Sequence, residues 1–438
     1  MARDVAVVLA YTPWTRYSVN ALASTLDLHV EADVYLVERL ENTVSLVKFL
    51  LDRYRRVVLG IGLNTIMLTD NRVLKEIKRI NRVLVDKRVL RVAGGPHATG
   101  DPLGTLYSLG FDVAVVGEGE ETLVDLVNTF SSGGDIHSVK GIYTVVDGEP
   151  KYTSRRRPVE LDKYPPFPIW RRIAGPIEIT RGCPYGCRYC QVSYMHGFQP
   201  RHRSIDNIVY HVESMARHGF HDIRFITPDG LGYGLGGRCR EPRLEAIEEL
   251  LHRLWERVCR RYGARIFYGT FPSEFRPEHI VPDVVRVLRR YVSNKSIIVG
   301  AQSGSDRVLE LIGRGHSVDD VYHAVEALVK NGFRADVDFI IGLPGETRDD
   351  LLESLHTMRK LVSMGARIHL HVFMPLPGTP FSQAPPGHIP DWLKREVYRL
   401  IGSGSAYGQW IRQEEIARKI DWLRRKGIIL PRRNKIHS

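Results

Sequence analysis

The sequence predicts an α/β fold of two domains, because two long stretches of the chain alternate β-rich apolar runs with helical patterns. In residues 1–130 the expected strands are Val5–Ala10, Asp33–Val37, Val57–Ile61, Leu90–Ala93 and Asp112–Val116. Between the third and fourth strands, apolar residues from Val73 to Leu84 recur at a spacing near 3.6 residues, which indicates a helix. Strands that alternate with helices form right-handed βαβ units, so we expect a doubly wound parallel sheet.

The second alternating stretch, residues 176–381, predicts six further βα units. Its expected strands are Pro176–Thr180, Ile223–Ile226, Arg265–Tyr268, Ser296–Gly300, Ala335–Ile341 and Arg367–Phe373. One helix is indicated by the capping-box pattern Ser317-Val318-Asp319-Asp320 and is ended by Gly332. Thr347 and Gly365 bracket the next helix in the same way.

Two other stretches complete the predicted domain organisation. The first, between the domains, opens on Ser131-Ser132-Gly133-Gly134, contains an expected hairpin at Asp147-Gly148 and ends in a proline-rich run near Pro168. Proline at this density does not continue a sheet interior or a helix, so we expect a linker. The predicted parts are the first domain at 1–130, the linker at 131–175, the second domain at 176–381 and a basic helical extension at 382–438.

Composition indicates an ordinary globular protein. Of its 438 residues, 43% are hydrophobic and 26% are charged. Apolar runs such as Val5–Ala10 are too short to span a bilayer, and the N-terminus lacks a targeting pattern. Five cysteines in a chain of this length fit a reducing compartment. We therefore expect a cytoplasmic protein without a membrane span.

The net charge of +12 is unevenly distributed along the chain. Residues 1–150 carry 16 Lys and Arg against 19 Asp and Glu, whereas the remaining residues carry 46 against 31. Such basicity can attract nucleic acid or another polyanion. Because no stacking aromatics are interleaved with the charges, a solvated basic face is the favoured interpretation.

Three closely spaced cysteines are the most informative motif. Cys183, Cys187 and Cys190 form C-x3-C-x2-C directly after the expected strand Pro176–Thr180, at the carboxyl end where parallel α/β folds place their chemistry. Three thiolates on a cubane cluster leave one iron without a protein ligand. The alternative is zinc with His196 as the fourth ligand, which is disfavoured because zinc loops usually have a distant second cysteine pair. The remaining cysteines, expected to be isolated thiols, are Cys239 and Cys259.

This motif, with Tyr189 immediately before its last cysteine, resembles the cluster motif of the radical S-adenosylmethionine (SAM) enzymes. The resemblance implies a (βα)6 partial TIM barrel and a [4Fe–4S] cluster whose open iron chelates SAM. It also implies reductive cleavage of SAM to a 5′-deoxyadenosyl radical, with the electron supplied by a donor of the ferredoxin or flavodoxin type.

The same resemblance implies a set of SAM-binding residues near the strand ends. These are Tyr189, Thr227, Asp229, Gln302, Ser303 and Glu346. Thr227 and Asp229 stand where the family often has Gly-Gly-Glu, and Gln302 stands where a glutamate is common. Asp229 beside Gly230 is equally an ordinary turn pair, and Glu346 also suits the N-terminus of the next helix.

Glycines after two strands of the first domain carry a second resemblance. Ala93–Thr99 and Gly117–Leu123 are similar to the flavodoxin-like cobalamin-binding domain that precedes many radical SAM cores. The residues that this implies at cobalamin are Gly94, Gly95, His97, Gly117, Glu118 and Gly119. The Asp-x-His-x-x-Gly signature is absent, since the nearest string, Asp27–Ala32, ends in alanine. We therefore expect no protein nitrogen on cobalt and interpret His97 as a turn residue.

Together the two resemblances predict a cobalamin-domain radical SAM enzyme that methylates an unactivated carbon. A small-molecule or lipid substrate fits this architecture, and so do a peptide and a tRNA, because the fold does not choose among them. One alternative is a member that does not transfer methyl groups and instead catalyses a rearrangement or an RNA modification. Another is an RNA-binding module that holds zinc or an iron–sulfur cluster. Methylthiotransfer is less favoured, because no cysteine precedes Cys183 to bind an additional cluster.

Overall fold

The computed structural model describes residues 4–430, and the chain divides into two compact units. The first comprises the described residues up to Ile173, Leu376–Gln383 and the described residues from Lys419 onward. The second comprises Ala174–Pro375 and Ala384–Arg418. No described helix is long and apolar enough to cross a membrane. The last residues of the expected basic extension, 431–438, lie outside the described part.

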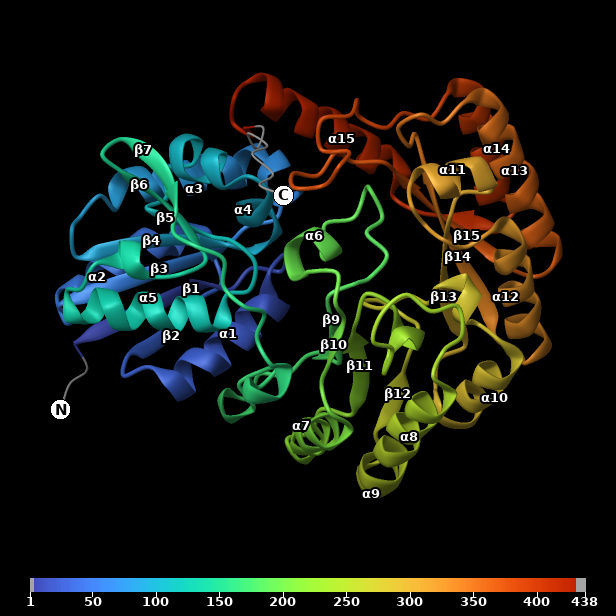
Figure 1. Cartoon of the computed structure of the whole chain (residues 1–438), viewed down its shortest axis with the longest axis horizontal. Coiled ribbons are helices and arrows are strands. Elements are labelled where there is room, and N and C mark those ends of the chain that lie inside the picture. The colour runs from blue at the N-terminus through green and yellow to red at the C-terminus, as the bar shows by residue number, and fades with distance from the viewer. Residues whose placement is uncertain (1–3, 431–438) are drawn as a thin grey trace. The chain divides into compact units, whose positions relative to one another are not determined.

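The first unit is built on a seven-stranded sheet in the order β2-β1-β3-β4-β5-β6-β7 (Figure 1). Its strands are β1 (Val5–Ala10), β2 (Asp33–Val37), β3 (Arg56–Gly62), β4 (Val89–Gly94), β5 (Val113–Val115), β6 (Ile142–Val146) and β7 (Glu149–Tyr152). The first five strands are parallel, which confirms the predicted doubly wound sheet and its flavodoxin-like order. All six residues of β1 are buried, as expected for a central strand that is covered on both faces.

Helices cover both faces of this sheet. Their bounds are α1 (Arg16–His29), α2 (Thr43–Leu51), α3 (Asn71–Val83), α4 (Gly95–Gly100) and α5 (Glu120–Ser132). Buried residues of α1 and α5, such as Leu26 and Leu126, pack with Val7 and Leu9 in one core. The predicted helix between the third and fourth strands is α3, whose apolar face includes the fully buried Ile77 and Ile80.

The expected linker forms part of this unit. Its hairpin is present, but β6 also pairs antiparallel with β5 and so lengthens the sheet. Ser24 donates a hydrogen bond to the carbonyl of Pro165 (2.7 Å), and Arg171 forms an ion pair with Asp27. The fully buried Ile142 explains this attachment, because it places apolar surface of the hairpin in the core.

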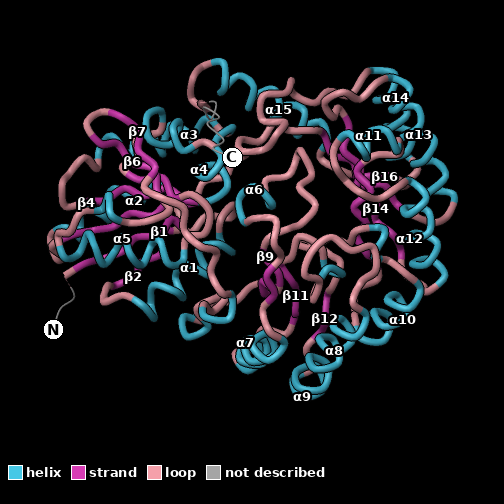
Figure 2. The backbone as a smooth tube through the Cα atoms, in the orientation of Figure 1, coloured by secondary structure: helices cyan, strands magenta, loops and turns pink. Residues whose placement is uncertain are grey.

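The second unit carries six parallel strands in chain order, as predicted for a (βα)6 partial barrel (Figure 2). They are β8 (Ile177–Glu178), β11 (Asp222–Ile226), β12 (Arg265–Phe267), β13 (Ser296–Gln302), β14 (Arg334–Ile341) and β15 (Arg367–Val372). Between β12 and β13, the N–H of Ile298 donates to the carbonyl of Gly269 (2.8 Å) and continues the arc. A short antiparallel pair, β9 (Thr180–Arg181) and β10 (Arg201–His202), follows β8.

Helices line the outer side of this arc (Figure 2). They are α7 (Ile205–Arg217), α8 (Leu244–Leu254), α10 (Pro282–Tyr291), α12 (Val318–Lys330) and α13 (Arg348–Ser363). Both predicted N-termini are confirmed, because Ser317 and Thr347 form capping boxes with Asp320 and Asp350. The following region contains the predicted helices, α14 (Asp391–Gly402) and α15 (Trp410–Arg425). It also contains β16 (Ala406–Tyr407), which pairs with β15 and was not expected.

Candidate active site

The three clustered cysteines lie on the loop between β9 and the short helix α6 (Val192–His196). Backbone hydrogen bonds fix this loop. The N–H of Cys190 donates to the carbonyl of Cys187 (3.0 Å), and the N–H of Cys183 donates to that of Gly197 (3.1 Å). All three thiols are free. They therefore stand together just beyond the first strand of the partial barrel.

The surroundings of these thiols suit metal-bound thiolates. Burial, reinforced by the neighbouring thiols Cys187 and Cys183, raises the pKa of Cys190 to about 12. Burial likewise raises the pKa of Cys183. At neutral pH these two thiols keep their protons unless a metal replaces them, because the metal supplies the opposing charge. The donor set thus fits an iron–sulfur cluster.

The same thiols are poorly arranged for one zinc ion. Zinc ligands at bond lengths of about 2.0–2.3 Å lie within about 4 Å of one another. Within the described part of the chain, the group of His, Cys, Asp and Glu side chains close enough to share one ion is Asp338, His369 and His371. It contains none of the cysteines and not His196. A cluster whose irons each take one thiolate accounts better for this spread.

A buried arginine contacts the cysteine loop. The guanidinium of Arg314 donates to Sγ of Cys187 at 3.8 Å and to the carbonyl of Gly300 at 2.6 Å. Glu274 lies 3.9 Å from the same guanidinium and offsets part of its charge. Hydrogen bonds to the ligand sulfurs and nearby charge set the reduction potential of such clusters. With a cluster bound, Arg314 would therefore favour its reduced, more negative state.

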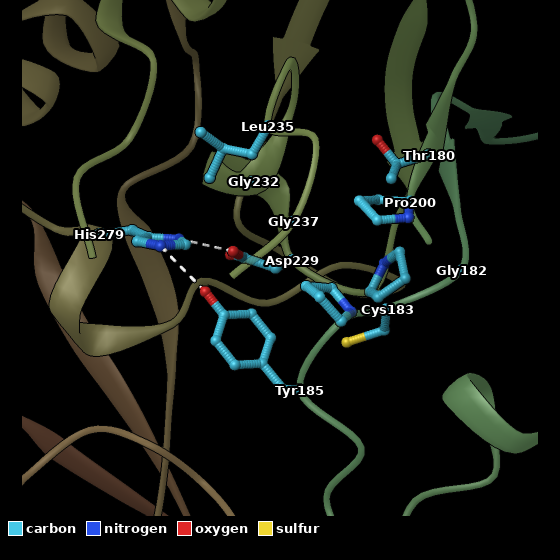
Figure 3. A pocket seen from close by; sticks show the side chains of 12 residues that line it. Thr180, Gly182, Cys183, Tyr185, Pro200, Asp229, Gly232, Leu235, Gly237 and His279 are labelled. Carbon is cyan, nitrogen blue, oxygen red and sulfur yellow. Dashed lines mark hydrogen bonds and ion pairs between the residues drawn. The ribbon is translucent and has the colours of Figure 1, made fainter. Parts of the chain in front are cut away.

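A pocket beside Cys183 is walled by a buried ion pair (Figure 3). Nδ1 of His279 lies 2.6 Å from Oδ2 of Asp229, and Nε2 lies 2.8 Å from the carbonyl of Cys239. The hydroxyl of Tyr185 also lies 3.3 Å from Nε2, but it donates to the same carbonyl of Cys239 (3.1 Å). Both ring nitrogens therefore face acceptors, an arrangement that favours an imidazolium. Burial opposes both charges, but the partners prevail: His279 and Arg276 hold the pKa of Asp229 below its usual value, and Asp229 raises the pKa of His279.

Glycines line one edge of the sheet in the first unit. Gly94 ends β4 and pairs with Gly62 at the end of β3, and Gly117 follows β5. Gly95 has a φ of +88°, and a Cβ there would lie 2.8 Å from the carbonyl oxygen of Leu63. Parallel α/β sheets bind their ligands at this carboxyl edge, and side-chain-free positions let a large planar ligand approach the backbone. The edge fits the cobalamin that the sequence predicts.

Two of the residues predicted at cobalamin have internal partners. His97 is 1% exposed, and its Nδ1 lies 3.0 Å from the hydroxyl of Thr65. Burial lowers the pKa of His97 to about 3, so the ring is neutral. Glu118 accepts a hydrogen bond from the N–H of Val159 at 2.8 Å. Gly119 precedes α5 as its N-cap.

Family models match both units. The Radical SAM superfamily model matches residues 177–358, and the B12 binding domain model matches residues 3–127. This chain is a cobalamin-domain radical SAM enzyme. Its cofactors are a [4Fe–4S] cluster, SAM and cobalamin.

Individual proteins resemble this radical SAM enzyme over most of its length. The structure of the radical SAM methyltransferase TsrM from Kitasatospora setae matches with a TM-score of 0.67 and 18% identity, over 87% of this chain and 77% of that one. An uncharacterized protein of Methanopyrus kandleri is 27% identical over 78% of this chain and 72% of its own. An uncharacterized methyltransferase of Pyrococcus horikoshii is 25% identical over 80% of this chain and 74% of its own length.

The structure gathers only part of the predicted SAM set near the cysteine loop. Asp229 lines the pocket beside Cys183, whereas the hydroxyl of Thr227 donates to the carbonyl of Asp229 (2.8 Å). Around Gly300, a Cβ would lie 2.7 Å from Nη2 of Arg314, 3.0 Å from Nε2 of Gln302 and 3.1 Å from Cδ of Glu274. These three side chains therefore converge. The assignment of the set to SAM stays a prediction.

The other predicted SAM residues have different surroundings. Tyr189 lies within electrostatic reach of Arg314, and burial raises its pKa well above the usual value. Ser303 faces α13, with its Oγ 3.4 Å from that of Ser354. Glu346 accepts the N–H of Gly342 (2.7 Å), and burial raises its pKa to about 7. Ser303 and Glu346 thus stabilise turns after their strands.

Four residues of the site were not predicted from the sequence, namely Glu274, Arg276, His279 and Arg314. Arg276 stacks on Tyr185, 3.4 Å from the ring centroid, and donates to Glu278. Glu274, Arg276 and Arg314 lie on loops and His279 ends a short 3-10 helix, and all four are far in sequence from the cysteines, without a spacing motif.

Proposed function

We propose that this enzyme is a cobalamin-dependent C-methyltransferase that acts on an unactivated carbon of a small-molecule or lipid substrate. The observation that carries the proposal is the union, in one chain, of a three-cysteine loop with a glycine-lined cobalamin edge. When bound, the cofactors supply a methyl donor and the radical that removes hydrogen from the carbon. The likeness to proteins named as methyltransferases supports this choice.

The chain's own residues prepare and confine this chemistry. Cys183, Cys187 and Cys190 hold the cluster and leave one iron for SAM. Arg314 donates to Sγ of Cys187 and thereby eases the reduction that a ferredoxin- or flavodoxin-type donor performs. The ion pair of Asp229 and His279 holds the pocket wall rigid, because breaking it leaves a buried charge unpaired.

Labelled SAM tests the proposal. Anaerobically reconstituted protein with cobalamin is incubated with a reductant, a cell extract and SAM carrying a ¹³C methyl group. We expect a product that carries the label on carbon, together with 5′-deoxyadenosine, and expect Cys187→Ala to form neither. Formation of 5′-deoxyadenosine with no labelled product would contradict methyl transfer and favour a rearrangement or another radical reaction.

A further inference from the structure

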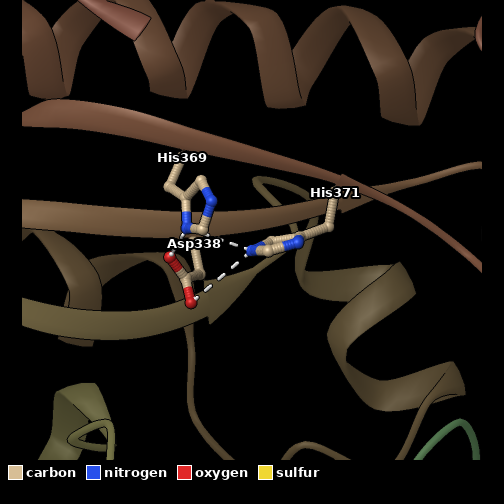
Figure 4. Close-up of side chains that lie close together, drawn as sticks. All are labelled: Asp338, His369 and His371. Carbon is tan, nitrogen blue, oxygen red and sulfur yellow. Dashed lines mark hydrogen bonds and ion pairs between the residues drawn. The ribbon is translucent and has the colours of Figure 1, made fainter. Parts of the chain in front are cut away.

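Three side chains on neighbouring strands of the second unit converge (Figure 4). Asp338 lies on β14, and His369 and His371 lie on β15. Asp338 and His369 are direct register partners, and His371 follows two residues later on the same face of the strand. The intervening Leu370 is fully buried on the opposite face. The register of two parallel strands therefore builds this trio.

The separations match those of ligands on one metal ion. Nδ1 of His369 lies 2.9 Å from Oδ1 of Asp338, Nε2 of His371 lies 3.1 Å from Nδ1 of His369, and Nε2 of His371 lies 3.8 Å from Oδ2 of Asp338. Bonds of about 2.1 Å place neighbouring ligands about 3.0 Å apart in an octahedral and about 3.4 Å apart in a tetrahedral site. We propose that Asp338, His369 and His371 bind a divalent transition-metal ion.

Hydrogen bonding alone leaves the trio unsatisfied. Oε1 of Gln413 accepts the N–H of Val372 (2.9 Å), so its amide NH2 is the group that faces Nδ1 of His371 (3.0 Å). Neutral His371 therefore carries its proton on Nε2. If Nδ1 of His369 carries a proton, two N–H groups face each other across the contact with Nε2 of His371. If Nδ1 of His369 carries no proton, its lone pair faces the ionised carboxylate of Asp338. An ion between the three atoms gives each of them a partner.

The ligand types select the class of ion. Two imidazoles and one carboxylate on one face form the facial arrangement that binds Fe²⁺ and related ions, whereas Mg²⁺ and Ca²⁺ prefer oxygen ligands only. The side chains of Asp338, His369 and His371 are 13%, 25% and 27% exposed, so an ion can reach them. Further coordination positions stay open for water or for an oxygen atom of a substrate.

Gln413 sets the affinity of this site. A metal on Nε2 moves the His371 proton to Nδ1, where it meets the donating amide, so Gln413 must turn away. In Gln413→Glu one oxygen still accepts from Val372, and the other accepts the Nδ1–H of His371. Carboxylate partners of this kind orient metal-binding histidines, and changes to them alter metal affinity by about 10–100-fold. The variant should therefore bind metal more tightly.

Manganese titration tests the site in the reconstituted holoprotein. Oxidised [4Fe–4S]²⁺ and cob(III)alamin are silent in electron paramagnetic resonance (EPR), so the signal of free Mn²⁺ reports binding, and thiolates compete poorly for this hard ion. We expect one equivalent bound to the wild type, loss of it in the isosteric Asp338→Asn, and at least about 10-fold tighter binding in Gln413→Glu. A matched control is His388→Ala, which removes a histidine that pairs with Glu414 and not with the trio, and this variant should bind like the wild type.

Identical titrations of the wild type and Asp338→Asn would overturn the proposal, as would a Gln413→Glu variant that binds no more tightly. Either result would leave the trio as a hydrogen-bonded cluster. The outcome of these titrations is independent of the proposed methyl transfer, because none of them depends on SAM cleavage.

Discussion

Two clusters in the second unit combine histidine with aspartate but differ in how their protons are placed. In the first, both nitrogens of His279 face acceptors, Asp229 and the carbonyl of Cys239, and one imidazolium satisfies them all. In the second, Asp338, His369 and His371 place their polar atoms close together with no proton arrangement that satisfies every contact. The first cluster is complete within the protein, whereas the second requires a bound cation.

This difference teaches which clusters of polar side chains support a site and which await a ligand. A closed ion pair stabilises the fold, and removing either partner leaves an uncompensated charge. An open cluster contributes little until its ligand arrives, and the ligand then adds stability by mass action. The two kinds of cluster should therefore respond oppositely to substitution and to metal.

The largest effect on stability is expected for Asp229→Asn. This isosteric change removes the charge that holds His279 as an imidazolium, so it should cost about 3–5 kcal/mol. The matched change Asp338→Asn in metal-free protein should cost less than about 1 kcal/mol, because it also relieves a repulsive contact. Chemical denaturation of both variants measures the difference, and equal losses would remove the distinction between the clusters.

The contribution of the Asp229–His279 pair to the free energy of unfolding should depend on pH. The raised pKa of His279 gives stability that is complete below its ordinary value of 6.5 and lost as pH rises through the folded value. The lowered pKa of Asp229 gives stability that is complete above 3.8 and lost as pH falls through its folded value. The stability difference between wild type and Asp229→Asn should thus be greatest between these limits. A difference that keeps increasing at alkaline pH would contradict the imidazolium.

A smaller effect, on the reduction potential of the iron–sulfur cluster, is expected from the arginines that link the Asp229–His279 pair to the cysteine loop. Arg276 donates to the carbonyl of Arg314, whose guanidinium donates to Sγ of Cys187. Arg314→Gln removes a charge-assisted donor worth about 1.5 kcal/mol, which corresponds to a fall of about 60 mV in a one-electron reduction potential. Redox titration followed by EPR checks this value. Arg314→Lys, which keeps the charge, should shift the potential less, and a rise in either variant would refute the role.

The smallest effect is expected for a change at His97 of the first unit, whose ring is buried and neutral. His97→Ala should leave the EPR spectrum of bound cob(II)alamin unchanged, because no protein nitrogen is expected on cobalt. Nitrogen splitting that is present in the wild type and lost in the variant would show that His97 is a ligand.

Much of the fold could be predicted, because it depends on local patterns. Val5–Ala10 and Asp33–Val37 match β1 and β2 at both ends, since continuous β-rich runs specify buried parallel strands. The attachment of the hairpin at Asp147 to β5 could not be predicted. It depends on pairing between Val113 and Thr144, and such register leaves no mark within either segment.

The candidate site likewise has a part that could be predicted from the sequence and a part that could not. The three cysteines carry their chemistry in a short spacing, so their cluster was predictable. His279 lies 50 residues from Asp229, and Arg314 lies 127 residues from Cys187, so only the folded chain brings these partners together. His369 and His371 were not predicted as a site; they share a face of β15, and Asp338 joins them through strand register alone.

Iron content and SAM cleavage test the central claim that the cysteine loop holds an open cluster. Anaerobically reconstituted protein should contain about four irons and, after reduction, convert SAM to 5′-deoxyadenosine. Changing Cys183, Cys187 or Cys190 to alanine should abolish both, whereas Cys259→Ala should preserve both. Stoichiometric zinc in the wild type, with no cleavage of SAM, would contradict the account.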